Sequence, residues 1–135
     1  MKAKLALVAR DVIIAADTGV PSAINILEGI LSEGFPMFLQ NIAFLSVWRR
    51  EEGDPAEFKG EMTVSIDDQE VLKHPATLVF KGTAEIARQV GQFQGLVIEK
   101  PSRLIFRLKF GEVTAEYSVF AKSRPQIAVP QEQPN

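Results

Sequence analysis

The chain has 135 residues, with 15 Lys and Arg, 17 Asp and Glu, one His and no Cys. This length fits a single folded domain, and the formal net charge of −2 is atypical of a dedicated nucleic-acid-binding protein, which carries a basic excess. The absence of cysteine excludes disulfides, thiol nucleophiles and cysteine-based metal sites.

The N-terminal segment predicts a strand over residues 5–16, followed by a turn at Asp17–Pro21. Its apolar run, Leu5–Ala9, is too short for a secretory signal, which needs roughly 7–15 apolar residues. No later stretch reaches the ~18 apolar residues of a membrane helix. We therefore expect a cytoplasmic protein with no membrane partner.

The next apolar segments lie at Ile24–Leu31 and Ile42–Trp48. The first fits either a strand or a short helix, and Gly29 together with three Ile residues favours a strand that opens into a turn. The second is apolar on both faces apart from Ser46, which predicts a central strand. One face of that strand is expected to meet the core, and the other a loop or a partner.

Two short strands are expected in the middle of the chain. Met62–Ile66 alternates apolar and polar residues and leads into a turn at Asp67–Glu70. Ala76–Lys81 is rich in residues that favour strands, and Lys73–Pro75 is expected to separate it from the preceding element because proline interrupts regular structure.

One further strand is expected between Thr83 and Ile98. Gly91 and Gly95 lie inside this segment, and glycine within a strand commonly marks a bulge or a bend. The sequence therefore predicts a single interrupted strand, of which Phe93–Ile98 is the more regular half.

The segment from Arg103 to Val119 predicts a β-hairpin with a two-residue turn at Gly111-Glu112. Alternate residues are apolar on both sides of this turn, so the turn also predicts the register. The expected pairs are Phe110 with Val113, Leu108 with Ala115, Phe106 with Tyr117, Leu104 with Val119, Arg107 with Glu116, and Lys109 with Thr114.

Turn residues recur at short intervals along the chain, which predicts an all-β fold. We expect a two-sheet antiparallel β-sandwich of seven to eight strands in residues 1–122. Residues 123–135 contain three prolines and few large apolar residues, so we expect a disordered or extended tail.

Few residues in the sequence suggest chemistry. His74, the single histidine, precedes Pro75 in a polar segment and is interpreted as a surface residue. Arg103, Arg107 and Lys109 share one strand face, where Glu112 and Glu116 are expected to pair with them. No catalytic residue and no cofactor are expected.

Acidic residues gather in two predicted loops. Some β-sandwiches bind calcium through such loops, although the spacing here lacks the alternation of a dedicated calcium loop. The main interpretation is a pair of solvated turns, and the alternative is a metal or small-molecule site. The candidate ligands for that alternative are Glu51, Glu52, Asp54, Asp67 and Asp68.

An unusually apolar segment suggests a partner. Phe35, Met37 and Phe38 flank Pro36 at a loop or strand entry. If exposed, these side chains would mark an interface, because large exposed apolar patches usually do. The competing interpretation is that they close the open end of the sandwich. A homodimer, formed by strand edges, is the leading form of the interface.

The order of the segments resembles an uncharacterised bacterial family of small stand-alone β-sandwich proteins. The resemblance covers about residues 5–121 and rests on turn and strand motifs. These motifs are Ala9–Ile14, Thr18–Glu28, Gly34–Pro36, Arg50–Phe58, Gln94–Leu96 and the final hairpin. It implies an Ig-like or C2-like sandwich from a bacterium, and it implies no catalytic or binding residues.

Taken together, the sequence favours a non-enzymatic protein that acts through protein–protein contacts, either with itself or with another protein. The alternative is a ligand-binding sandwich with a calcium or small-molecule site in the acidic loops. Neither interpretation involves nucleic acid.

Overall fold

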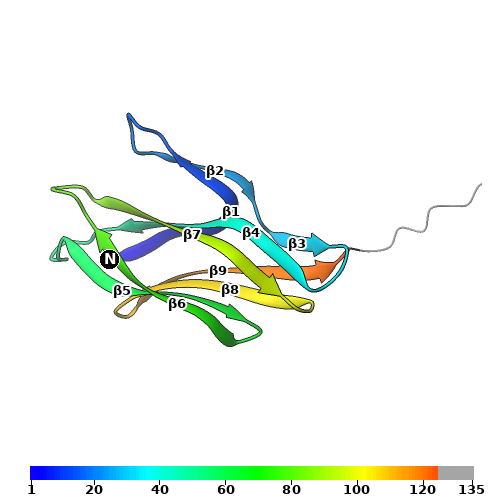
Figure 1. The fold of residues 1–135 in the computed structure, drawn as a ribbon. Coiled ribbons are helices and arrows are strands. Elements are labelled where there is room, and N and C mark those ends of the chain that lie inside the picture. The colour runs from blue at the N-terminus through cyan, green and yellow to red at the C-terminus, as the bar shows by residue number, and fades with distance from the viewer. Residues whose placement is uncertain (125–135) are drawn as a thin grey trace, which may run out of the picture.

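The computed structural model describes residues 1–124, and this part of the chain forms nine β-strands and no helix (Figure 1). It therefore contains no helix long and apolar enough to cross a membrane. The strands are β1 (Lys2–Ile14), β2 (Pro21–Ile26), β3 (Gly29–Ser32), β4 (Met37–Arg49), β5 (Glu57–Ile66), β6 (Gln69–Val79), β7 (Ile86–Ile98), β8 (Ser102–Phe110) and β9 (Val113–Ser123). The predicted all-β class is confirmed.

The strands form two sheets that lie one on the other (Figure 1). The four-stranded sheet has the order β2-β1-β4-β7, and the five-stranded sheet has the order β3-β9-β8-β5-β6. All neighbours are antiparallel except β3 and β9, which are parallel. The chain crosses between the sheets after β2, after β3, after β4, after β6 and after β7, so each sheet contains strands from both halves of the sequence.

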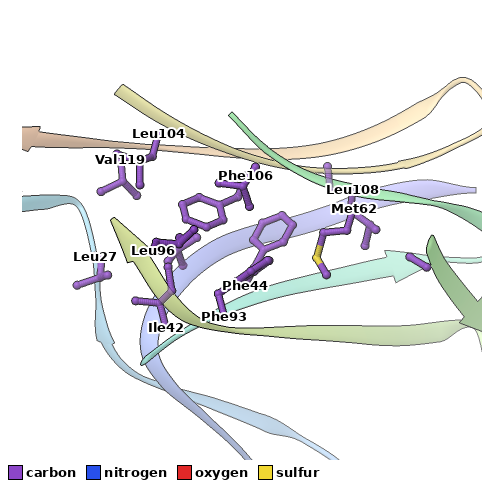
Figure 2. Packing of buried hydrophobic residues seen from close by; sticks show 14 of the residues in the cluster. Leu27, Ile42, Phe44, Met62, Phe93, Leu96, Leu104, Phe106, Leu108 and Val119 are labelled. Carbon is purple, nitrogen blue, oxygen red and sulfur yellow. The ribbon is translucent and has the colours of Figure 1, made fainter. Parts of the chain in front are cut away.

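The main core lies between the two sheets, where Figure 2 shows aromatic and aliphatic side chains from both sheets meeting. Phe44 of β4 and Phe93 of β7 pack against Phe106 of β8, with ring centroids 5.9 Å and 5.7 Å from it. Trp48 is fully buried at the other end of β4, edge-on to Phe110 at 5.2 Å. Apolar burial of this kind is the dominant stabilising contribution in a domain of this size.

The predicted hairpin of β8 and β9 is confirmed in detail. All six predicted residue pairs occur in the structure. Gly111 has a φ of +60° and Glu112 is not among the residues with positive φ, as a type II′ turn requires. Arg107 and Glu116 form an ion pair at 2.8 Å on the outer face.

Two element predictions are corrected. Lys73–Pro75 does not separate strands, because β6 runs continuously from Gln69 to Val79. Proline is tolerated there since β6 is the outer strand of its sheet. In Ile24–Leu31 the expected strand that opens into a turn is present as the end of β2, and the helix alternative is wrong; the turn is followed by β3, a strand of the other sheet that was not expected. This additional strand accounts for a strand count above the expected seven to eight.

The strand β7 is also continuous, and its two glycines have different roles. Gly95 has a φ of +80°, as expected for an irregular position. Gly91 is a packing glycine, because a Cβ atom there would lie 2.6 Å from Cε of Met62.

At two places the alternation of inward and outward side chains is interrupted in both strands of an antiparallel pair, at residues that lie opposite each other. Leu39 and Ile42 of β4 are three residues apart, yet both point into the main core, and Leu96 and Phe93 opposite them do the same. Gln40 and Gly95, which lie opposite each other, do not form a regular cross-strand pair. The register of the pairs on either side of them is unchanged. We call such an irregular position a crease.

A second crease lies between β1 and β2, at Arg10 and Asn25, where Asn25 has a φ of +56°. Ala9 and Val12, three residues apart, both belong to a second apolar cluster on the face of the four-stranded sheet that points away from the main core.

The predicted tail begins within β9, which ends at Ser123. Residues 125–135 of that tail lie outside the described residues.

Candidate interaction surface and predicted site residues

The three residues predicted as an interface are divided by the structure. Phe35 and Met37 are half-buried and pack against the main core, so they close one end of the sandwich. Phe38 is 58% exposed, and its ring lies against Gly95. Val97, its partner across β4 and β7, is 51% exposed. Phe38 and Val97 therefore form a small exposed apolar patch.

The five predicted metal-binding acids are not brought together. Glu51, Glu52 and Asp54 lie in the β4–β5 loop, and Asp67 and Asp68 form the β5–β6 turn. These loops are at opposite ends of the ten-residue strand β5, which spans roughly 33 Å. Within residues 1–124, no three His, Cys, Asp or Glu side chains gather closely enough to share a metal ion.

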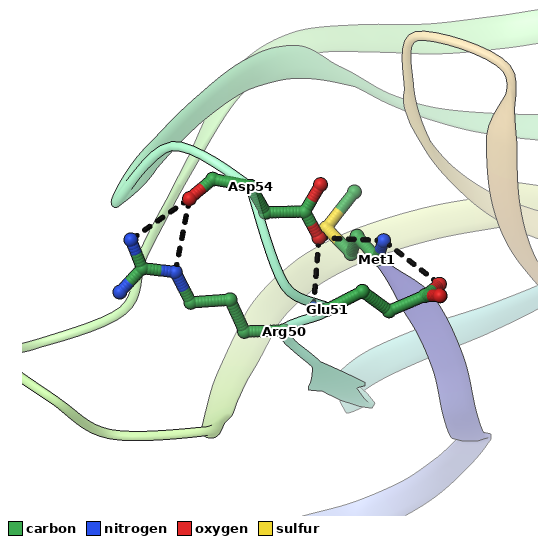
Figure 3. Close-up of polar contacts among 4 residues, drawn as sticks. All are labelled: Met1, Arg50, Glu51 and Asp54. Carbon is green, nitrogen blue, oxygen red and sulfur yellow. Dashed lines mark hydrogen bonds and ion pairs between the residues drawn. The ribbon is translucent and has the colours of Figure 1, made fainter.

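The first acidic loop binds the N-terminal ammonium group of Met1 instead (Figure 3). The Met1 nitrogen lies 3.0 Å from Oε1 of Glu51 and 2.6 Å from Oδ2 of Asp54. The hydrogen bond to Asp54 and then that to Glu51 raise the pKa of the ammonium above its ordinary 8.0. The same ammonium, followed by the backbone N–H of Glu51, lowers the pKa of Asp54.

Arg50 holds this loop through backbone carbonyl groups. Its Nε and Nη2 donate to the carbonyl oxygen of Asp54 at 3.1 Å and 2.8 Å, and its own backbone N–H donates to Glu85. The N-terminal ammonium therefore pairs with both Glu51 and Asp54 and offsets part of their charge, and Arg50 shapes the loop.

The second acidic turn is also used within the fold. Asp67 accepts a hydrogen bond from the backbone N–H of Arg103 at 2.9 Å, which joins the β5–β6 turn to the start of β8. Asp67 and Asp68 both have positive φ, at 48° and 64°, and aspartate tolerates this turn conformation better than most residues.

The other polar residues of interest lie on the surface. His74 is exposed on β6. On the outer face of the five-stranded sheet, Arg107 pairs with Glu116, as predicted. Arg103 donates to Oγ of Ser118 at 3.2 Å, and its guanidinium carbon lies 5.8 Å from the centre of the Phe120 ring.

The surface that sequence reasoning missed is the far half of the β1–β2 hairpin. Beyond the crease, residues 11–24 form a two-stranded ribbon that projects from the sandwich body, and we call it the arm (Figure 1). β4 pairs with β1 only from Lys2 to Ala9, so among the described residues the arm part of β1 has only β2 as a neighbour.

The arm exposes apolar side chains on both faces. Ile13 and Ile24 are 51% and 41% exposed on one face, and Ile14 is 46% exposed on the other. Val20 at the tip is 51% exposed, and Ile26 at the base is 50% exposed. Half of the twelve large apolar residues that are exposed in the described chain therefore lie in β1, β2 or the turn between them.

The base of the arm is attached to the body by two hydrogen bonds. The backbone N–H of Leu27 donates to the carbonyl of Val8, and the Tyr117 hydroxyl donates to the carbonyl of Leu27 at 2.8 Å. Burial, and to a smaller extent the charge of Glu28, raises the pKa of the Tyr117 hydroxyl that donates this hydrogen bond.

One sequence signal could have identified the arm. Ile13 and Ile14 are adjacent, and so cannot both point to one buried face of a strand. Asp17 is the only charged residue from Val12 to Leu27. A hairpin that is apolar on both faces needs cover on both faces, and the structure buries Val12 but leaves Ile13, Ile14 and Ile24 exposed.

Comparison with known proteins adds no assignment. Neither the family models nor the curated proteins include a match for this chain.

Proposed function

We propose that this protein is a non-enzymatic protein–protein interaction module, and that the arm is its main binding surface. The observation that carries the proposal is the exposure of Ile13, Ile14, Val20 and Ile24 on a ribbon of which the body buries Val12 but not these four side chains. Exposed apolar surface of this kind usually marks an interaction site. Two-stranded ribbons are also marginally stable alone, so a partner would stabilise the arm.

A non-enzymatic role is supported by how the chemistry-bearing groups are used. Glu51 and Asp54 bind the Met1 ammonium, and Asp67 holds the start of β8. His74 is exposed on an outer strand. These contacts give the groups structural roles, whereas the exposed apolar side chains of the arm and of the smaller Phe38–Val97 patch are not packed in the described residues.

The proposal includes the cytoplasmic location and the bacterial, Ig-like or C2-like family expected from the sequence. Its support is the order of the turn and strand motifs between residues 5 and 121.

The test is photo-crosslinking in cells with a benzophenone amino acid at Ile13. Thr77, exposed on β6, is the matched control position. We expect discrete covalent adducts from position 13, because an exposed apolar arm is covered when its partner is present, and we expect none from position 77. Equal labelling from both positions, or no discrete adduct from position 13, would overturn the proposal.

The same probe at Phe38 tests the smaller patch. An adduct from that position adds Phe38 and Val97 to the interaction surface, and its absence removes them from it.

A further inference from the structure

We propose that the partner of the arm is an acidic segment of a different protein, bound where the inner face of the arm, which contains Val12, meets the outer face of the four-stranded sheet. Apolar side chains of this segment contact Leu5 and Ile14, and its carboxylates pair with cations of the sheet, chiefly Arg88. This inference rests on the proposed function, since it gives the chemistry of the partner that the same surface binds.

The arm and the sheet share an apolar contact that leaves part of its surface exposed. The arm turns back at the crease, and Val12 packs in one buried cluster with Leu7 and Leu45 of the sheet (Figure 1). Side chains alternate along a strand, so Ile14 shares the face of Val12, and Leu5 shares the face of Leu7. Ile14 and Leu5 are each 46% exposed. The packed contact therefore continues into two apolar side chains that the described chain leaves open.

The charges of the four-stranded sheet are unbalanced. Its strands contain one acid, Asp11, and five cations, which are Lys2, Lys4, Arg10, Arg49 and Arg88. Within residues 1–124, no ion pair involves any of these five cations. In the strands of the five-stranded sheet, six cations accompany four acids, and two of those acids are paired. The positive charge is therefore a local property of one sheet in a chain whose net charge is −2.

The strand register places three of these cations beside the exposed apolar surface. Leu5 pairs with Val47, and Val47 pairs with Arg88, so these residues form one row across β1, β4 and β7. Lys2 and Arg49 form the next row on the same face. An apolar strip edged by unpaired cations is complementary to a segment that carries apolar and acidic side chains.

Two loop acids offset part of this positive charge. Glu52 and Glu85 line a hollow together with Lys2 and Arg49 at the end of the sheet. Arg88 does not line that hollow and lies directly beside Val47. We therefore expect Arg88 to contribute more to recognition than the other two cations.

The same rows disfavour other occupants. A twofold contact between two copies through this face would bring Lys2, Arg49 and Arg88 close to their own copies, at a cost from like charges. The two rows contain no aromatic side chain, on which the bases of single-stranded nucleic acids usually stack. Asp17 in the turn at the tip of the arm would meet the anionic headgroups of a membrane.

The test is a selection from a random twelve-residue peptide library displayed on phage, with the full chain as the target. We expect the selected peptides to carry a net negative charge and at least one large apolar residue. The matched control peptide, in which Asn and Gln replace Asp and Glu, should bind at least about tenfold more weakly. Selection of neutral or basic peptides, selection of none, or equal binding of the control peptide overturns the inference.

Two variants of the chain test where the selected peptide binds. Arg88→Glu should weaken its binding about tenfold, because a like charge then faces the carboxylates. Lys59→Glu makes the same charge change on an exposed position of β5 and should change binding less than about twofold, because a distant surface charge is screened. Circular dichroism checks that both variants are folded. Equal weakening by the two variants would show that only net charge matters and would overturn the proposed position.

Other anionic partners are tested with the same variant. Vesicles that contain phosphatidylglycerol, and a single-stranded RNA, are assayed against the full chain. Binding of either probe that is tighter than that of the peptide and is lost in Arg88→Glu overturns the choice of a protein partner. The absence of such binding supports it.

The photo-crosslinking experiment at Ile13 separates this inference from the proposed function. Adducts with other proteins, together with acidic selected peptides, support both. Adducts with other proteins, together with neutral or basic selected peptides, keep the proposed function and overturn the inference, and so do adducts only between two copies of this chain. The absence of any adduct overturns both.

Discussion

The arm and the sandwich body contain the same kinds of apolar residue but use them differently. In the body, Val8, Phe44 and Leu108 are almost fully buried between two sheets. In the arm, Ile13 and Ile24 are about half exposed on a two-stranded ribbon. Apolar residues in the body therefore stabilise the monomer, whereas those of the arm are available for association. This contrast separates stability from function, and substitutions in the two regions should affect different measurements.

The largest expected effect is Trp48→Ala in the body. Trp48 is fully buried, packs on Phe110, and donates from its indole Nε1 to Oγ of Ser46 at 2.9 Å. Its removal should lower the free energy of unfolding by about 3–5 kcal/mol in urea denaturation. Ile13→Ala in the arm is the matched variant and should cost less than about 0.5 kcal/mol. Similar losses of unfolding free energy for the two variants would contradict the distinction between a stabilising body and an exposed arm.

A smaller effect is expected when a methyl group is added to the body. A Cβ atom at Gly60 would collide with the backbone carbonyl of Lys109 on β8, so Gly60→Ala should cost about 3 kcal/mol. Gly91→Ala should cost only about 1 kcal/mol, because the flexible end of Met62 can move away. Urea denaturation measures both losses.

Ser22→Val is the arm control for these two variants, and it should change the stability by less than about 0.5 kcal/mol. If Gly91→Ala proved as costly as Gly60→Ala, the Met62 side chain would be more rigid than we infer.

The joint between arm and body can be tested at Tyr117. Tyr117→Phe removes the hydrogen bond to the Leu27 carbonyl and should lower the free energy of unfolding by about 1 kcal/mol. It should also speed amide hydrogen exchange at Leu27, whose N–H is bonded to Val8. Exchange that stays unchanged while stability falls would show that Tyr117 does not hold the base of the arm.

The smallest effect concerns the N-terminal ion pairs, which fix the other end of β1 to the body. The stabilising effect of the raised ammonium pKa is complete below pH 8.0 and is lost as the pH rises through the folded-state pKa. The effect of the lowered Asp54 pKa is present above pH 3.8 and is lost as the pH falls through its folded-state value.

Asp54→Asn should therefore lower the melting temperature near pH 6 by a small amount, and this difference should shrink as the pH rises through the raised pKa of the ammonium and in strong acid. It should leave the association through the arm unchanged. A difference in melting temperature that is equal at pH 6 and pH 10 would exclude the ammonium as its cause.

The sequence predictions were accurate where neighbouring residues determine the structure, and they were wrong where distant segments determine it. The β8–β9 hairpin was predictable to the residue pair, because Gly111 defines the turn and strict alternation defines the faces. His74 and Pro75 were misinterpreted as a break, because proline is compatible with a strand that has one free edge, and edge position is set by the whole fold.

The candidate site was only partly predictable for a similar reason. Phe35, Met37 and Phe38 look equivalent in the sequence, yet the first two pack on the core and only Phe38 is exposed. The arm was missed because a strand prediction for residues 5–16 does not reveal where β4 stops pairing with β1. That limit is set by sheet assembly between distant segments.

The creases have a consequence for engineering this protein. At each crease both paired strands have one irregular residue at the same level. The set of residues that points to a given face therefore changes in both strands together. Deletion of Gln40 alone would leave Gly95 unmatched as an extra residue on β7, while Leu39 and Ile42, then two residues apart, would share a face by ordinary strand alternation. Removal of Gln40 and Gly95 together would keep the two strands in phase with each other. The unit of insertion or deletion in this part of the sheet is therefore a pair of residues on neighbouring strands, and sequence changes that respect the fold should occur there in pairs.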